Sequence, residues 1–182
     1  MPTLIDAAGP RADTWTRLEA AGADALATAA AAVAPGADLL VTLDAWQTAP
    51  ELLSSAARLG VLLEPDDPPE ALAEAIDRLA LVAVRFPSFT DGRGYSTARL
   101  LRERLGFAGE LRAVGDVQRD QVFYLARCGF DSFELRDGED ATAAVAALAT
   151  FSEAYQAAHD RGPLFDRRFP QATRARRKAA VL

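Results

Sequence analysis

The sequence lacks most of the side chains that bind transition metals or form disulfides. Cys128 is the only cysteine and His159 the only histidine among 182 residues. A single thiol cannot form an internal disulfide, and one thiol with one imidazole would need several carboxylates to complete a zinc site. One cysteine is too few for a conventional iron-sulfur cluster, and no flavin or haem signature is present. We therefore expect neither a metal nor another cofactor.

Long hydrophobic runs are also missing. No apolar segment approaches the roughly 20 residues that span a bilayer, and the start of the chain lacks the basic and apolar parts of a signal peptide. Half of the residues are nevertheless hydrophobic, which is enough for one sizeable core in a chain of this length. The sequence predicts a soluble, globular, cytoplasmic protein with no membrane partner.

Positive charge is scarce in the first part of the chain. Residues 1–77 carry 3 basic and 13 acidic side chains, whereas residues 78–136 carry 10 basic and 7 acidic ones. Residues 137–160 contribute a charge of −5, and residues 161–182 contribute +6. Positive charge is thus gathered in the middle segment and in the tail. This pattern favours a small anion, such as sulfite, sulfate or a phosphate group, over a surface wrapped in nucleic acid.

Short apolar runs alternate with amphipathic runs from residue 38 onward. The apolar runs predict five strands, at residues 39–43, 61–63, 81–86, 111–115 and 132–135. Strands separated by helices form βαβ units with right-handed crossovers, so we expect an α/β fold with a mostly parallel five-stranded sheet and flanking helices. Periodicity leaves open whether this sheet is open, as in flavodoxin-like or Rossmann-like folds, or resembles half of a barrel.

The predicted α/β domain is a single one and covers residues 38–160. The alanine-rich residues 1–37 show little periodicity and are interpreted as a poorly specified N-terminal extension. Residues 161–182 read as a basic C-terminal tail. Within the domain, a last helix is predicted from about residue 140 to residue 158.

Two polar loops follow the third and fourth predicted strands, and each leads into a predicted helix. The first contains the candidate ligand-binding residues Asp91, Gly92, Arg93, Gly94, Tyr95 and Ser96. Glycine can take a positive φ and let the backbone approach a ligand, and the helix that Ser96 is predicted to cap would offer free N–H groups. With Arg99 nearby, the loop is a candidate cradle for phosphate, sulfate or sulfite. A tight turn that requires glycine, with Asp91 capping its own backbone, explains the same residues.

The second loop places Asp116, Arg119 and Asp120 at the start of the next predicted helix. Asp116 is most simply an N-cap, and Arg119 is a further candidate for binding an anion. Asp116 and Asp120 could also divide acid and base roles, provided that their environments separate their pKa values. Both are therefore candidate catalytic residues. Because the carboxyl ends of parallel strands share one rim, we expect the two loops to lie together.

Charged residues interrupt the predicted strands. Arg85, Arg112 and Glu134 occupy positions where central parallel strands are normally apolar. They either pair, for instance Arg112 with Glu134, or line a pocket, and pairing is favoured because an unpaired buried charge is costly. Cys128 stands just before Gly129 at a predicted helix end, where a thiolate is disfavoured, so we interpret it as a core residue.

The segment from residue 86 to residue 131 carries a long combined motif. It reads Phe-Pro at 86–87, Asp-Gly-Arg-Gly-Tyr-Ser at 91–96, Ala-Arg-Leu-Leu-Arg at 98–102, Gly-Glu-Leu-Arg-Ala-Val-Gly-Asp-Val at 109–117, Arg-Asp-Gln at 119–121 and Arg-Cys-Gly-Phe-Asp at 127–131. This motif closely resembles the bacterial domain of unknown function family 934 (DUF934). The likeness covers roughly residues 38–136.

Members of that family are typically encoded beside sulfite reductase and other genes of assimilatory sulfate reduction, and are sometimes labelled probable oxidoreductases. The resemblance implies an accessory protein of sulfite reduction, which binds the reductase or a small sulfur oxyanion through the two loops. Two alternatives stay open. One is a small-molecule enzyme that acts on a phosphorylated or sulfated substrate, and the other is a structural partner that docks through its tail.

Overall fold

One curled β-sheet forms the centre of the molecule. Its strands are β1 (Thr3–Asp6), β2 (Gly9–Arg11), β3 (Thr16–Leu18), β4 (Leu39–Thr42), β5 (Leu59–Leu63), β6 (Leu81–Phe86), β7 (Glu110–Val117) and β8 (Ser132–Leu135). They lie in the order β2-β1-β8-β7-β6-β5-β4-β3. β3 to β8 run parallel to one another, and β1 pairs antiparallel with both β2 and β8. The computed structural model describes residues 2–19, 23–48, 56–152, 154–162 and 167–168.

The expected single α/β domain with a mostly parallel sheet is confirmed, and the five expected strands are present as β4 to β8. The expected number of strands is wrong, because the sheet has eight. The additional strands, β1 to β3, come from residues 3–18 and are three or four residues long, too short to show a period. Among the described strands, β3 to β8 follow one another in chain order, as in a barrel, without the reversal of a doubly wound sheet.

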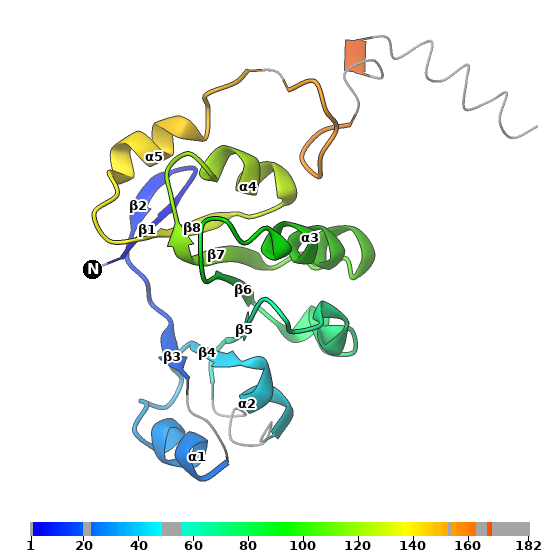
Figure 1. Ribbon diagram of the computed structural model, residues 1–182. Helices are drawn as coiled ribbons and strands as arrows, with labels where there is room; N and C mark the ends of the chain where they lie inside the picture. The colour runs from blue at the N-terminus through cyan, green and yellow to red at the C-terminus, as the bar shows by residue number, and fades with distance from the viewer. Residues whose placement is uncertain (1, 20–22, 49–55, 153, 163–166, 169–182) are drawn as a thin grey trace, which may run out of the picture.

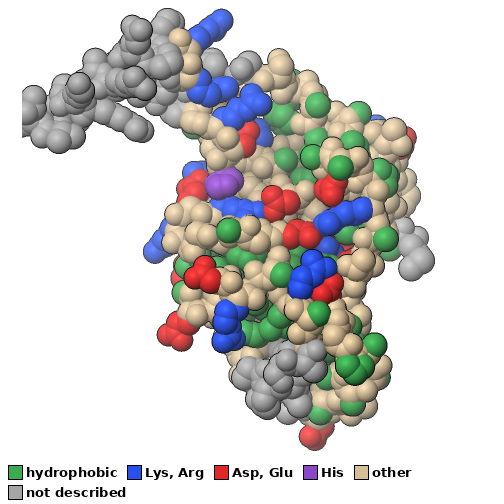
Figure 2. Space-filling view, turned by 180° about the vertical axis from the view of Figure 1, so that it is seen from behind, with side chains coloured by type: hydrophobic (Ala, Val, Ile, Leu, Met, Phe, Trp, Pro, Cys, Tyr) green, Lys and Arg blue, Asp and Glu red, His purple; other side chains and the backbone are tan. Residues whose placement is uncertain are grey.

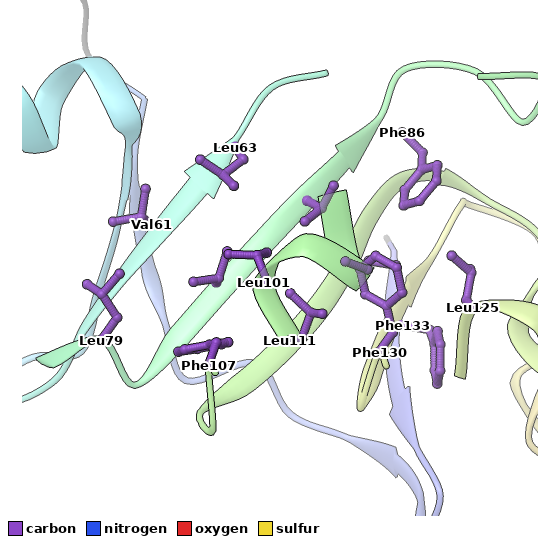
Figure 3. Close-up of a cluster of buried hydrophobic side chains, with 14 of the residues drawn as sticks. Val61, Leu63, Leu79, Phe86, Leu101, Phe107, Leu111, Leu125, Phe130 and Phe133 are labelled. Atoms are coloured by element: carbon purple, nitrogen blue, oxygen red, sulfur yellow. The ribbon is translucent and has the colours of Figure 1, made fainter. Parts of the chain in front are cut away.

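Helices cover the outer face of the sheet (Figure 1). They are α1 (Ala23–Ala31), α2 (Leu43–Thr48), α3 (Arg93–Arg99), α4 (Val122–Cys128) and α5 (Ala141–Ala147), and a π-helical turn, Leu100–Arg104, extends α3. The main core lies between these helices and the sheet, where Phe86, Leu101, Leu111, Leu125 and Phe133 are each at most 1 % exposed (Figure 3). In the described ranges, no helix is long and apolar enough to cross a membrane.

Three predicted helix features differ from the structure. Ser96, predicted to cap a helix, lies inside α3, which begins at Arg93. Asp116, predicted to be an N-cap, lies within β7 and caps no helix. The helix predicted over residues 140–158 ends as α5 at Ala147, because the side chains that follow are mostly exposed and offer no apolar face to hold a longer helix. Most of the predicted basic tail lies outside the described residues.

Gly115 explains why Asp116 stays in the strand. Gly115 has a φ of +100°, and a Cβ at this position would collide with the carbonyl oxygen of Phe86 on β6. The pairing of β7 with β8 shifts register between Ala113 and Val117. β7 therefore continues through this irregularity to Val117 instead of ending before Asp116.

The segment that joins β2 to β3 crosses the inner face of the sheet, opposite the helices (Figure 1). Its Trp15 is buried against Gly60, where a Cβ would lie 3.2 Å from Cζ3 of Trp15. Around it lies a second, smaller apolar cluster, formed by Leu40, Leu62, Leu81, Ala83 and Val114. Arg17 of β3 pairs with Glu134 of β8 although these strands are not neighbours. The ion pair therefore spans the inside of the curl.

Arg112 is the largest fully buried side chain, with 1 % exposed. Its Nη1 donates to Oδ1 of Asp13 at 2.9 Å, and its Nε and Nη2 donate to Oε1 of Glu110 at 3.1 and 2.9 Å. The prediction that charges in the strands pair is confirmed here. The predicted partner is wrong, because Glu134 pairs with Arg17 instead.

Candidate functional site

The two polar loops lie side by side, because each follows one of the neighbouring strands β6 and β7. The backbone N–H of Phe89, in the first loop, donates to Oδ2 of Asp116 at 3.0 Å. In return, Nε2 of Gln121, in the second loop, donates to the carbonyl oxygen of Phe89 at 3.1 Å. The structure thus brings the loops together on one rim and connects them by hydrogen bonds.

Asp116 has a structural task in this connection. Its Oδ2 accepts the N–H of Phe89, and its Oδ1 lies 3.4 Å from Nη1 of Arg136. Both carboxylate oxygens are therefore engaged with groups of the protein itself. These contacts give Asp116 a structural role that accounts for it without catalysis.

Arg93 is paired with two carboxylates. Its Nε donates to Oδ1 of Asp91 at 3.0 Å, its Nη2 to Oδ2 at 2.6 Å, and its Nη1 pairs with Asp66. The hydrogen bond from the Arg93 side chain lowers the pKa of Asp91 and raises the pKa of Arg93. An anion at this position would approach two negative charges, which weakens the case for the predicted cradle.

Packing of α3 against β6 accounts for Gly94 of the first loop, whereas nothing in the structure requires glycine at Gly92. Neither Gly92 nor Gly94 has a positive φ. A Cβ on Gly94 would lie 2.5 Å from Cζ of Phe86, so glycine lets the helix approach the strand closely. Tyr95 packs edge-on against Phe86, with 5.5 Å between ring centroids, and burial raises its pKa. Ser96 is exposed on α3.

Arg99 is engaged in the same way as Arg93. Its Nε lies 3.1 Å from Oε1 of Glu103, one turn further along the chain, and this hydrogen bond raises the pKa of Arg99. Two of the three arginines that were candidates for holding an anion thus pair with carboxylates. Figure 2 shows that acidic and basic side chains lie intermingled over the face of the molecule that it presents.

Arg119 and Asp120 are the charged candidate site residues whose side chains are unengaged within the described part of the chain. Within the described part of the chain, neither side chain makes a hydrogen bond or an ion pair, although the backbone N–H of Arg119 donates to Oε2 of Glu139 at 3.3 Å. Both side chains are exposed. They lie at a groove between α4 and α5, two helices that pack against each other.

This α4–α5 groove has a volume of about 520 Å³. In this groove the ring centroids of Phe123 and Phe151 lie 5.2 Å apart. Tyr124 is 50 % and Phe151 62 % exposed, which is unusual for large aromatic side chains. The groove is lined by Arg119, Asp120, Phe123, Tyr124, Ala143, Ala146, Ala147, Thr150 and Phe151. Aromatic residues and arginine are the types most enriched where proteins bind one another.

Most of this groove was not predicted from the sequence. Phe151 and the alanines of α5 lie outside both polar loops, and no local pattern connects them to the second loop. One signal was available on α4 itself. Val122 and Leu125 form its buried stripe, so the adjacent aromatic pair Phe123 and Tyr124 must point away from that stripe.

A second charged cavity, of about 540 Å³, opens at the inner face near the N-terminal segment. Arg11 pairs there with Glu110, and Arg17 pairs with Asp13 and Glu134. Cations and anions offset each other, so the cavity shows no preference for a ligand of either charge. Across the described ranges, no group of three or more His, Cys, Asp or Glu side chains is placed to hold a metal ion.

Cys128 is 2 % exposed, and burial raises the pKa of its thiol. A reactive cysteine needs the opposite, an accessible thiolate with a lowered pKa. The interpretation of Cys128 as a core residue is therefore confirmed by its burial.

The fold and the site define a single-domain α/β protein with a curled sheet, an internally paired polar rim and an exposed aromatic groove. Over residues 60–165 the chain matches the family model described as a bacterial protein of unknown function, DUF934. This match spans more than half of the chain, so the protein belongs to the DUF934 family, as the motif indicated. No curated protein matches the chain.

Proposed function

We propose that this DUF934 protein is a non-catalytic accessory protein of assimilatory sulfite reduction, and that it acts in the cytoplasm by binding the sulfite reductase. One observation carries the binding role, namely the exposed aromatic surface of the α4–α5 groove beside the unengaged side chains of Arg119 and Asp120. The link to sulfite reduction rests on the family resemblance of the motif in residues 86–131.

The groove can contribute substantially to binding. Tyr124 and Phe151 each expose half or more of their surface, so covering both rings would bury on the order of 200 Å² of mostly apolar area. At about 25 cal/mol per Å², this burial is worth about 5 kcal/mol before the entropy of association is subtracted. A stable interface buries about 800 Å² on each partner, so the groove would be the centre of a larger contact.

The same observations disfavour the interpretation of the site as an anion-binding site or as an enzyme active site. A small sulfur oxyanion would have to displace carboxylates from Arg93 and Arg99, or bind to Arg119 alone. An enzyme with Asp116 as its acid or base would have to break the hydrogen bond that joins the two loops. A protein partner needs neither rearrangement.

Biolayer interferometry with the purified sulfite reductase of the same organism tests the proposal. We expect saturable binding with a Kd of about 1 μM or tighter, that is about −8 kcal/mol. Calorimetry with sulfite and with sulfate should give no binding heat. If the reductase does not bind, the proposed function is wrong.

Growth on sulfate separates the accessory role from the enzyme. In a strain that lacks the gene, an Arg93→Ala variant should complement as well as the wild type, because Arg93 lies outside the groove and performs no chemistry in the proposed role. Loss of complementation by Asp120→Asn in a folded protein whose Kd for the reductase is unchanged would favour catalysis instead.

A further inference from the structure

We infer that the α4–α5 groove receives a segment of the partner protein in which acidic side chains lie next to a bulky apolar one. This inference rests on the proposed protein-binding function and specifies the surface and the chemistry that it recognises. The juxtaposition that carries it is an edge-to-face pair of aromatic rings, one of them exposed, beside two arginines that share one carboxylate among the described residues.

The groove continues into a smaller pocket of about 140 Å³. Phe123 and Phe151 line both, so this edge-to-face pair of rings lies between the groove and the pocket. The pocket is also lined by Arg127, Asp160 and Arg161. We call this part of the surface the arginine end.

Two arginines share one carboxylate at the arginine end. Nε of Arg127 lies 3.5 Å from Oδ1 of Asp160, and Nε of Arg161 lies 4.0 Å from Oδ2 of the same residue. Within the described part of the chain, Arg127, Arg161 and Asp160 thus contribute two positive charges and one negative charge to the arginine end, which attracts an acidic segment.

Arg127 also has an unused hydrogen-bond donor. The residue is 8 % exposed, and its buried Nε makes no hydrogen bond within the described part of the chain. Its Nη2 donates to the carbonyl oxygen of Gln156, and its guanidinium lies over the ring of Phe123 at 6.0 Å. Oδ1 of Asp160 lies 3.5 Å from this Nε and pairs with it in charge, but it does not complete a hydrogen bond. A buried N–H without a hydrogen-bond acceptor is destabilising, and a carboxylate bound in the pocket would supply that acceptor.

The rest of the groove suits an apolar side chain. Ala143, Ala146 and Ala147 of α5 leave room beside the two rings because their side chains are small. At the far end, Arg119 and Asp120 offer one cation and one anion, so that end sets the orientation of a bound segment without a preference for net charge. A basic segment would face the excess of arginines at the other end and be repelled.

Affinity measurements on exposed residues test this assignment. Phe151→Ser removes one ring of the aromatic pair, and Arg161→Glu reverses one charge of the arginine end. Both residues are exposed, so the variants should remain folded. We expect each to weaken the Kd for the sulfite reductase about tenfold or more. The matched controls are Phe89→Ser and Arg104→Glu, at side chains that are also exposed but lie outside the groove. They should bind within about twofold of the wild type.

Overlapping synthetic peptides that cover the reductase sequence test the chemistry of the segment. Those that compete best with the intact reductase should contain Asp or Glu beside a bulky apolar residue. These peptides should bind the Arg161→Glu variant more weakly than they bind the wild-type protein. Peptides in which Lys replaces the acidic residue should show the reverse order, with tighter binding to the variant than to the wild-type protein.

The possible results distinguish a failure of this inference from a failure of the proposed function. Wild-type binding to the reductase that neither groove variant weakens overturns this inference and leaves the proposed function intact. No binding by the wild type overturns the proposed function and the inference with it. Competition by neutral or basic peptides overturns the inference, and so does displacement of the reductase by millimolar sulfate alone, which would indicate a site for a free anion.

Discussion

Replacing Arg112 by alanine perturbs the ion-pair cluster on the inside of the curled sheet. The substitution removes a guanidinium that is 1 % exposed and donates three hydrogen bonds, two to Glu110 and one to Asp13. It also removes the link between β7 and the N-terminal segment that carries Asp13. We expect the variant to fold but to lose much of its stability.

The structure sets the size of the loss. Removing one member of a buried ion pair destabilises a protein by about 3–5 kcal/mol. The loss should lie at the lower end, because Glu110 keeps its hydrogen bond from Ser132 at 2.6 Å and the side chain of Asp13 is 29 % exposed. About 3 kcal/mol corresponds, for a domain of this size, to a decrease in Tm of about 6–12 °C.

Urea unfolding measures this change. Trp15 lies on the inner face beside the cluster, so its fluorescence reports on the N-terminal segment, while far-UV circular dichroism reports on the whole fold. Arg104→Ala is the control, because its side chain is 71 % exposed and lies 4.0 Å from Glu70, and it should stay within about 0.5 kcal/mol of the wild type. A loss below about 1 kcal/mol for Arg112→Ala would refute the reasoning, since a buried charge pair would then contribute no more than a surface one.

Three further predictions follow from the same structure. Burial would raise the pKa of Glu110, but the hydrogen bond from Ser132 and the neighbouring arginines outweigh burial and lower this pKa. The stability that Glu110 contributes is therefore fully present above its unfolded pKa of about 4.3. It is lost as the pH falls through the lower pKa of the folded protein. Urea midpoints of the wild type should therefore fall more steeply below about pH 4.3 than those of Glu110→Gln, and equal slopes would contradict this. Gly115→Ala should destabilise the protein by about 2 kcal/mol more than Gly106→Ala. Both glycines have a positive φ, but only at Gly115 would the new methyl group meet the backbone of β6. Calorimetric Tm values measure the difference, and equal losses of stability in the two variants would contradict the prediction. The thiol of Cys128 should react with a disulfide reagent at least about tenfold more slowly in the native protein than in urea, because it is buried and its pKa is raised; similar rates would mean that the thiol is accessible.

The strands of the main sheet were predictable because their pattern is local. Leu81–Phe86 and Ser132–Leu135 appear with the predicted bounds, since buried parallel strands read as continuous apolar runs. The strand Thr16–Leu18 was not predictable, because three residues show no period and its pairing with β4 depends on the tertiary fold. Asp116 was misread for a related reason, because an Asp after an apolar run indicates a helix cap unless the strand continues past it.

The candidate site likewise has features that could be predicted from the sequence and features that could not. Parallel topology was enough to predict that the two loops would meet, and the bond between Phe89 and Asp116 joins them. The pairing of Arg93 with Asp66 was beyond sequence reasoning, because Asp66 follows a different strand. Phe151 was missed because its contact with Phe123 joins α4 to the segment that follows α5, which lies far from α4 in the sequence.

The sequence by itself determined the α/β class, the parallel strands, the shared rim of the two loops and membership of the DUF934 family. These depend on composition, on short apolar periods and on a contiguous motif, all of which are properties of neighbours in the chain. Only the tertiary structure decided which charges are paired and which surface is left for a partner. Ion pairs form between side chains that the curl of the sheet brings together, and the α4–α5 groove exists because two short helices leave aromatic side chains uncovered between them.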